Sequence, residues 1–275
     1  MSVGWLFLAS IAAGLVGAVS GLGGGVVLIP VLTFFGVDIK RAIALSVLSV
    51  ITVSSGAALV YVRRHLPNLK ISAFLDLFAV FGALIGASLT LVSARGPLFL
   101  LCGGVIVVSS LWLWRQQRHP WTPARQQDAF SKRLELAGSY YDSVEQHTIT
   151  YGATRAAMAG PLMFGTGVLS GWLGLGSSAL TVLIHDAVLG LPPKVSLTTS
   201  NLIIGVMALA SASVYLEAGM IDPQLAAPVI LGVPLGALLG SRLLLYSPNR
   251  SARLICLSAL IVFGIELIVH GLRGA

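Results

Sequence analysis

Charged residues are scarce in this sequence: only 10% of its 275 residues are Asp, Glu, Lys or Arg. Soluble domains carry about 25%, so this chain could not cover a water-facing surface, and we predict an integral membrane protein. Cysteine is also scarce. Cys102 and Cys256 have no cluster of histidines beside them, and no P-loop is present, so we expect neither a metal site nor a cofactor. No Lys or Arg precedes Lys40, which argues against a cleaved signal peptide at the start.

Apolar residues, by contrast, make up 56% of the chain, and the mean hydropathy is +0.92. A helix that crosses a hydrocarbon core of about 30 Å needs about 20 mostly apolar residues, and eight segments come close to that length or exceed it. The first and the fifth are longer than one crossing needs and have glycines in their middle. The predicted fold class is therefore an all-α membrane protein with about eight segments. They are residues 4–35, 42–62, 71–93, 97–114, 159–187, 195–216, 223–246 and 252–269.

A polar stretch from Arg115 to about Ala157 separates the first four segments from the last four. It holds six of the seventeen Lys and Arg residues, so the positive-inside rule predicts that it lies in the cytoplasm. We predict a first transmembrane repeat at 1–115, a polar cytoplasmic linker at 116–158 and a second transmembrane repeat at 159–275. The net charge of +7 then reflects topology, and no nucleic-acid partner is expected.

The two sets of four segments are similar to each other. Shifting the chain by 153 residues places Gly14 and Gly21 on Gly167 and Gly174, and after one inserted residue an offset of 154 holds. Duplicated halves with a glycine-interrupted segment at matching positions are typical of a transporter whose site lies where the repeats meet. The offset of 154 pairs Lys40 with Lys194, Ser46 with Ser200, Tyr61 with Tyr215, Gly82 with Gly236, Gly86 with Gly240, and Cys102 with Cys256.

The glycines that interrupt the first and fifth segments each cost a helix about 1 kcal/mol relative to alanine. A helix broken inside the membrane exposes backbone N–H groups and the positive end of its dipole, which suit an anion where they line a polar cavity. These glycines therefore either line a substrate site or only allow helices to pack closely. They are Gly21, Gly23, Gly24, Gly25, Gly174 and Gly176.

Other small residues are expected to have a structural role. The pairs Gly82/Gly86 and Gly236/Gly240 have the small-xxx-small spacing that is common where membrane helices touch. We therefore expect these four glycines to pack helices against each other and not to contact a substrate.

The order of these motifs resembles the TauE/SafE sulfite exporter family of membrane transporters, over nearly the whole chain. This resemblance implies the transport of sulfite, sulfoacetate or another small organic anion. A "GSYYD" segment at 138–142 also looks like the family's linker. The matching segments are "GAVSGLGGGVVLIPVL" at 17–32, "AIALSVLSV" at 42–50, "GVLSGWLGLGSSALTVLI" at 167–184 and "LPPKVSLTTSNLIIG" at 191–205.

The second half departs from the family's pattern. Ser177 and Ser178 stand where the family has glycines, and Leu183 stands where the first half has Pro30. Either the serine hydroxyls bind the substrate together with backbone N–H groups, or the second half has lost its symmetry for a particular substrate.

Polar side chains also occur in the second segment of each half, where lipid offers no water to satisfy them. Ser46 lies in the first half, and Thr199, Ser200 and Asn201 are adjacent in the second. Ser and Thr hydroxyls often donate back to carbonyls of their own helix. The alternative is that they donate hydrogen bonds to the oxygens of a bound anion, and Asn201 is the costliest of them to leave without a partner.

Five ionisable residues are candidates for gating or proton coupling. Lys40 and Lys194 begin the second segment of each half, where they either extend to lipid headgroups or attract anions towards the entrance. Asp76 lies inside a span, and ionisable residues there are candidate functional residues. His185 and Asp186 are adjacent, and a histidine beside a carboxylate titrates in a range that would suit coupling to protons.

Charge leaves two topologies open. In the first half, Arg63, Arg64 and Lys70 lie on the linker's side of the membrane. In the second half the balance reverses, because the loop at 216–222 has no Lys or Arg. Four full crossings per half give parallel repeats, whereas glycine breaks that make the first and fifth segments re-entrant give inverted repeats with three crossings each.

The predicted function is secondary transport of a small sulfur-containing anion out of the cell, in a multi-pass protein of the bacterial cytoplasmic membrane without enzymatic activity. Three alternatives are an anion channel, a carrier of a non-sulfur organic anion, and a membrane scaffold or assembly subunit that transports nothing. Its expected partners are the small anion and the lipid bilayer. Coupling to protons and assembly into a homo-oligomer stay open.

Overall fold

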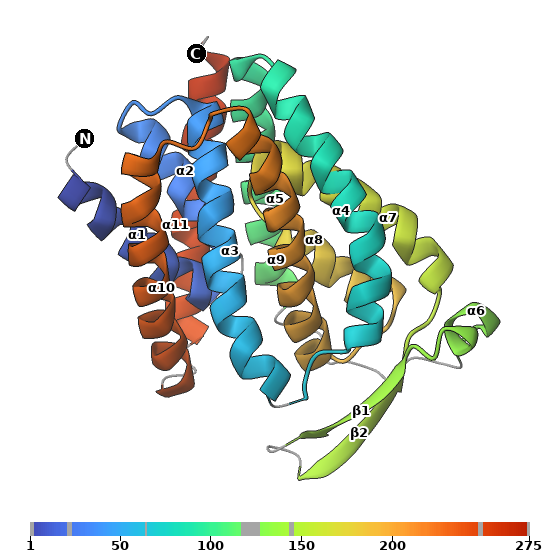
Figure 1. The fold of residues 1–275 in the computed structure, drawn as a ribbon. Coiled ribbons are helices and arrows are strands. Elements are labelled where there is room, and N and C mark those ends of the chain that lie inside the picture. The colour runs from blue at the N-terminus through green and yellow to red at the C-terminus, as the bar shows by residue number, and fades with distance from the viewer. Residues whose placement is uncertain are drawn as a thin grey trace.

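The computed structural model describes residues 3–20, 24–63, 65–116, 127–142, 146–246 and 250–273. Its helices form one bundle, and a small two-stranded antiparallel sheet projects from one end (Figure 1). Within the described residues, six helices are long and apolar enough to cross a membrane. The predicted class, an all-α membrane protein, agrees with this architecture.

The helices of the first half are α1 (Val3–Ser20), α2 (Gly25–Phe34), α3 (Ile39–Arg63), α4 (Leu69–Val92) and α5 (Arg95–Gln116). The connecting region contains α6 (Ala129–Arg133), β1 (Ala137–Asp142) and β2 (His147–Gly152). The second half begins with α7 (Ala156–Leu173), α8 (Ser178–Leu183) and the π-helical turn η1 (Ile184–Val188). It continues with α9 (Pro193–Glu217), α10 (Pro223–Tyr246) and α11 (Arg250–Leu272). Helices α1 and α7 thus each end at a glycine-containing interruption, and a much shorter helix follows.

The end of the bundle that carries β1 and β2 is called the hairpin end. Asn68, between α3 and α4, donates through its side-chain amide to the carbonyl of Ala137 (3.4 Å) and to the hydroxyl of Tyr151 (3.3 Å). Thr154, just before α7, donates its backbone N–H to the carbonyl of Leu189, just after η1 (3.0 Å). Because α7 begins where η1 ends, the chain from α7 to η1 enters and leaves the bundle at the hairpin end.

The opposite end is held by contacts between the first turns of some helices and the last turns of others. Arg95 forms an ion pair with Asp38 (2.7 Å), and the Lys40 ammonium donates to the carbonyl of Leu91 near the end of α4 (2.8 Å). The ring of His270, near the end of α11, lies 4.9 Å from the ring of Phe99, near the start of α5.

These contacts fix the direction of each helix. Helix α3 starts at the opposite end and finishes at the hairpin end, whereas α9 starts at the hairpin end and its Tyr215 reaches Thr90 in the last turn of α4. Helices α4 and α10 also run in opposite directions, as do α5 and α11 (Figure 1). The helices that the 154-residue offset pairs therefore run antiparallel.

The main packing contacts cross between the halves: α1 packs along α10, and α7 packs along α4. Glycines allow the close approach. A Cβ on Gly82 or Gly236 would lie too close to a backbone carbonyl oxygen of the partner helix, that of Phe164 or Ile11 respectively. Gly86 faces Val168 in the same way. The predicted packing role of these three glycines agrees with this geometry, and no substrate contact is needed to explain them.

Candidate functional site

The second break, between α7 and α8, has an unusual backbone. Gly174, Gly176 and Ser177 have φ values of +65°, +71° and +37°, all in the left-handed region. Glycine adopts this region without a steric cost, whereas a residue with a Cβ pays on the order of 1 kcal/mol. Ser177 therefore holds a strained conformation, and strained residues are concentrated at functional sites.

The two breaks meet inside the bundle. A Cβ on Gly25, the first residue of α2, would lie 2.9 Å from the carbonyl oxygen of Gly174. Ser46 of α3 donates its hydroxyl to that same carbonyl (2.8 Å). A Cβ on Gly176 would lie 3.0 Å from both Val50 of α3 and Ile204 of α9, residues that the 154-residue offset pairs. The described start of α2 and the second break thus lie against α3, and Gly176 of the second break also lies against α9.

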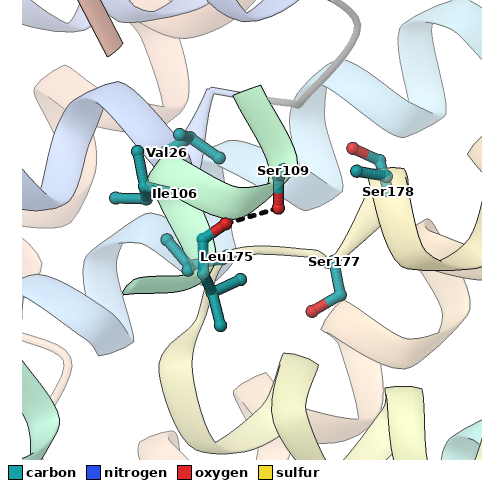
Figure 2. Close-up of a pocket in the computed structure, with 8 residues that line it drawn as sticks. Val26, Ile106, Ser109, Leu175, Ser177 and Ser178 are labelled. Atoms are coloured by element: carbon teal, nitrogen blue, oxygen red, sulfur yellow. Dashed lines mark hydrogen bonds between the residues drawn. The ribbon is translucent and has the colours of Figure 1, made fainter. Parts of the chain in front are cut away.

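A small cavity of about 10 Å³ opens beside the second break. This is close to the space that one water molecule needs. Figure 2 shows Ser177 before α8 and Ser178 in its first turn, with Val26 of α2 and Ile106 and Ser109 of α5 around them. The lining residues are Val26, Val105, Ile106, Ser109, Leu175, Ser177, Ser178 and Ala179.

Two hydroxyls in this cavity lack hydrogen-bond partners. Ser177 and Ser178 are only 5% and 6% exposed, and within the described part of the chain neither hydroxyl is hydrogen-bonded. Burying a hydroxyl in this way costs about 1–3 kcal/mol. Both serines come from the sequence-predicted site, they are consecutive in the sequence, and neither hydroxyl has a hydrogen-bond partner among the described residues.

The other hydroxyls predicted to bind substrate, those of Ser46, Thr199 and Ser200, form hydrogen bonds within the protein. The single hydroxyl proton of Ser46 is shared between the carbonyls of Ile43 (2.7 Å) and Gly174 (2.8 Å). Ser200 donates to the carbonyl of Leu197 (3.0 Å). The structure places Asn201 beside Ser54, whose hydroxyl donates to its backbone carbonyl. Direct contact of these residues with a substrate stays a prediction.

Thr199 lies towards the hairpin end. Its hydroxyl accepts a hydrogen bond from the backbone N–H of Asn68 (3.0 Å). The side chain of Asn68 in turn accepts from the N–H groups of Lys70 and Ile71 and so caps the start of α4. Thr199 therefore joins α9 to the α3–α4 loop.

The two predicted gating lysines lie at opposite ends of the bundle. Lys40 donates to a carbonyl in the last turn of α4, where a cation also interacts favourably with the helix dipole. Lys194, in the first turn of α9, is exposed at the hairpin end. Asp76 accepts a hydrogen bond from Ser72 of the same helix (3.0 Å) and does not line the cavity.

His185 and Asp186 lie in η1, between α8 and the hairpin end. His185 is fully buried, and its Nδ1 lies 3.2 Å from the carbonyl oxygen of Ser196 in the first turn of α9. A carbonyl only accepts, so this contact places the proton on Nδ1. The Nε2 atom is buried and has no hydrogen bond within the described residues. A π-helical turn is rare and is often found at functional sites.

Among the glycines of the first break, Gly21 and Gly23 lie outside the described residues. Gly24 precedes α2, and a Cβ there would lie 3.2 Å from the hydroxyl of Ser49 on α3. Gly24 and Gly25 are thus packed closely against α3, as Gly176 is against α3 and α9.

Ser109 of α5 lines the cavity but was missed by the sequence analysis. Its hydroxyl donates to the carbonyl of Val105 in the preceding turn (2.5 Å), and its lone pairs stay available. A possible signal was the adjacent pair Ser109 and Ser110 within an apolar span. Nothing in the sequence, however, indicates that α5 packs beside the second break.

The comparisons with known proteins show the family of the chain. The sequence model of the family described as "Sulfite exporter TauE/SafE" matches residues 6–267. The chain belongs to this family. As a TauE/SafE protein it is a membrane transporter, and the resemblance inferred from the glycine breaks is confirmed.

Two TauE/SafE relatives come from Bacillus subtilis (strain 168). The chain is 25% identical to "Probable membrane transporter protein YunE" over 280 residues, which cover 99% of each protein. It is 26% identical to "Probable membrane transporter protein YdhB" over 238 residues, 86% of each. No solved structure matches this TauE/SafE chain.

Proposed function

We propose that this TauE/SafE protein is a carrier that exports a small sulfur oxyanion, sulfite or an organosulfonate, through the second break. The observation that carries the proposal is the pair of buried hydroxyls on Ser177 and Ser178, which have no partner in the described chain. A sulfite or sulfonate group presents three oxygens that accept hydrogen bonds, so it matches adjacent donors. The family's description supports the sulfur oxyanion and its export.

The chemistry of the cavity supports weak and reversible binding. None of its lining residues is charged. A lysine or arginine there would hold a desolvated anion tightly and slow its release. Neutral hydroxyls and backbone N–H groups satisfy the anion's oxygens at lower strength, as a carrier requires at the step where substrate leaves.

The size of the cavity supports a carrier over an open channel. Sulfite has four heavy atoms, and a cavity of about 10 Å³ has room for about one water molecule. The site must therefore widen to load its substrate and close again afterwards. A channel would instead need a continuous polar path, and the residues around this cavity are mainly apolar.

The helix directions support an inverted pair of repeats in the membrane, each with a re-entrant first segment. Seven basic residues with described side chains lie at the hairpin end, namely Arg63, Lys70, Arg115, Lys132, Arg133, Arg155 and Lys194. Four lie at the opposite end, namely Lys40, Arg41, Arg95 and Arg273. By the positive-inside rule, the hairpin end faces the cytoplasm of a bacterial cell, and the substrate leaves at the opposite end.

The test is counterflow of labelled sulfite in proteoliposomes that contain the purified protein. A carrier gives uptake that saturates and is stimulated by unlabelled sulfite inside the vesicles, whereas a channel gives linear flux without this stimulation. Ser177→Leu is the matched negative control, because leucine removes the hydroxyl and fills the cavity. Flux that stays the same in this variant would remove the second break from the mechanism.

A panel of sulfite, sulfoacetate, taurine, thiosulfate and sulfate, with acetate as a carboxylate, defines the substrate class. We expect sulfite or sulfoacetate to compete best with labelled sulfite. If acetate competes and no sulfur compound does, the protein carries a non-sulfur organic anion.

A further inference from the structure

The end of α7 is held in an unusual way. The last four carbonyl groups of a helix have no partner inside the helix and must be satisfied from elsewhere. In α7 each of the four accepts a hydrogen bond from a side chain on a different helix. Tyr215 of α9 donates to Gly171 (2.5 Å), Thr90 of α4 to Trp172 (2.7 Å), Cys102 of α5 to Leu173 (3.8 Å, through sulfur) and Ser46 of α3 to Gly174 (2.8 Å). We call Ser46, Thr90, Cys102 and Tyr215 the clasp.

The centre of the clasp is the pair formed by Tyr215 and Thr90. Both residues are fully buried, and their hydroxyl oxygens lie 2.9 Å apart. Trp172, whose carbonyl Thr90 binds, is also held through its ring N–H, which donates to the hydroxyl of Ser93 (2.8 Å). The end of α7 is thus tied to the last turn of α4 by both its backbone and a side chain.

One member of the clasp has no equivalent in the other half of the sequence. The 154-residue offset matches Tyr215 with Tyr61, but it matches Thr90 with Leu244, which has no hydroxyl. Tyr61 is half-buried, and its hydroxyl makes no hydrogen bond within the part of the chain that the structure describes. Ser200, the counterpart of Ser46, donates to its own helix. The Thr90 bond is therefore specific to the second break, where the hydroxyls of Ser177 and Ser178 have no partner among the described residues.

We propose that the clasp residues are positioning residues for the substrate site. By holding the end of α7 in place, they fix one side of that site. This proposal rests on the proposed transport function. The clasp holds the carbonyls of residues 171–174, and Gly174 is the first of the three left-handed residues of the break. The clasp therefore sets where the strained loop leaves the helix and so where Ser177 and Ser178 point. None of the four clasp side chains lines the cavity, so they act through the backbone.

A physical argument connects the clasp to the two serines. A short loop with three left-handed residues and two buried hydroxyls without partners would gain free energy by relaxing to pair those hydroxyls. Four hydrogen bonds to rigid neighbouring helices prevent this relaxation. The site thereby keeps its donors available for the substrate, which is preorganisation of a binding site.

The experiment uses Tyr215→Phe and Thr90→Val, which remove a hydroxyl with almost no change in shape. Tyr61→Phe is the matched control, because it makes the same change at the equivalent position of the first half. Thr90→Ser keeps the hydroxyl and serves as the conservative rescue. For each variant, hydrogen–deuterium exchange of residues 171–178 is measured in detergent or nanodiscs. Sulfite uptake by each variant is then measured in proteoliposomes over a range of sulfite concentrations.

We expect Tyr215→Phe and Thr90→Val to exchange at 171–178 roughly fivefold faster than the parent and to raise the KM for sulfite roughly three- to tenfold, the effect of one lost hydrogen bond. Maximal uptake should change much less, whereas a general loss of folded protein would lower maximal uptake and leave KM alone. Tyr61→Phe and Thr90→Ser should resemble the parent in both measurements.

If exchange at 171–178 is unchanged in both Tyr215→Phe and Thr90→Val, the proposed positioning role of the clasp is wrong. It is also wrong if exchange is faster but the KM for sulfite is unchanged. If the parent protein transports no sulfite, the proposed function fails, and the exchange data alone then decide whether the clasp fixes the loop. If Tyr215→Phe does not fold, Thr90→Val with its Thr90→Ser rescue carries the test.

Discussion

At the scale of single residues, Ser177 combines a strained backbone with a buried hydroxyl that has no partner in the described chain. We expect Ser177→Gly to raise the melting temperature, because glycine relieves the left-handed strain and the hydroxyl is removed. Ser177→Ala should raise the melting temperature less, because it removes the hydroxyl but keeps the left-handed strain. Both should weaken sulfite uptake by roughly tenfold or more. Thermal melts and proteoliposome uptake measure the two effects.

Ser88 provides the control for these variants. It is an exposed residue of α4 whose hydroxyl donates to the carbonyl of Leu84. Ser88→Ala should leave both melting temperature and uptake near those of the parent. A Ser177→Gly protein that melts at a lower temperature and transports normally would show that Ser177 has a structural role.

Two glycines on the same helix give a second prediction at this scale. A Cβ on Gly167 would collide with the carbonyl of Ala79 on α4, whereas nothing lies within 4 Å of a Cβ on Gly165. Gly167→Ala should therefore destabilise the protein by about 1–3 kcal/mol. Gly165→Ala should be neutral or slightly stabilising, since alanine is the better helix former. Melting in detergent compares them, and equal melting temperatures would contradict the packing role.

At the scale of elements, a carboxylate in the connecting region, that of Asp128, forms a hydrogen bond at the start of α7. Asp128, before α6, accepts hydrogen bonds from the hydroxyl of Ser131 (2.5 Å) and from the backbone N–H of Arg155 (2.9 Å). The Ser131 hydroxyl, with backbone N–H groups in addition, lowers the pKa of Asp128 below its ordinary value. A carboxyl with a lowered pKa stabilises the fold above its unfolded pKa of about 3.9, and this contribution is lost as the pH falls through the folded pKa.

Acidification should therefore loosen α6 from the start of α7. A spin label on Lys132→Cys, an exposed position of α6, should gain mobility as the pH falls below the unfolded pKa of about 3.9 and through the lower folded pKa. Asp128→Asn keeps an oxygen that accepts hydrogen bonds but cannot titrate, so in that background the spectrum should change much less. A change of equal size in both backgrounds would assign the effect to another group.

The elements also show what the sequence could and could not predict. The glycine breaks were predictable because glycine inside an apolar segment is costly and must have a cause. The place of Ser177 and Ser178 in the second break was predictable because they align with glycines of the first half. The bonds from Tyr215 and Thr90 to α7, and the bond between Thr199 and Asn68, were not. They depend on which helices become neighbours, and apolar segments in a membrane carry little information on that.

At the scale of the whole molecule, the direction of the two halves can be tested directly. Leu69, after the α3–α4 loop, and Ala218, after α9, are both exposed and lie at opposite ends of the bundle. In whole cells, a membrane-impermeant thiol reagent should label Ala218→Cys and spare Leu69→Cys. Inside-out vesicles should give the reverse. Labelling of the parent protein gives the background from Cys102 and Cys256, and labelling of both positions from one side would favour parallel repeats.

Because α1 and α7 each pack along a helix of the other half, the order of synthesis determines when each contact can form. Helix α7 finds α4 already made when it leaves the ribosome, because α4 precedes it in the chain. Helix α1 is made first, yet it packs mainly along α10, which follows some 200 residues later. The face of α1 that packs on α10, where Gly14 lies against Val233, must therefore wait in the membrane without its partner until translation is almost complete. A nascent chain that stops before α10 therefore contains the main packing partner of α7 but not that of α1, so the α10-facing surface of α1 is left to the lipid.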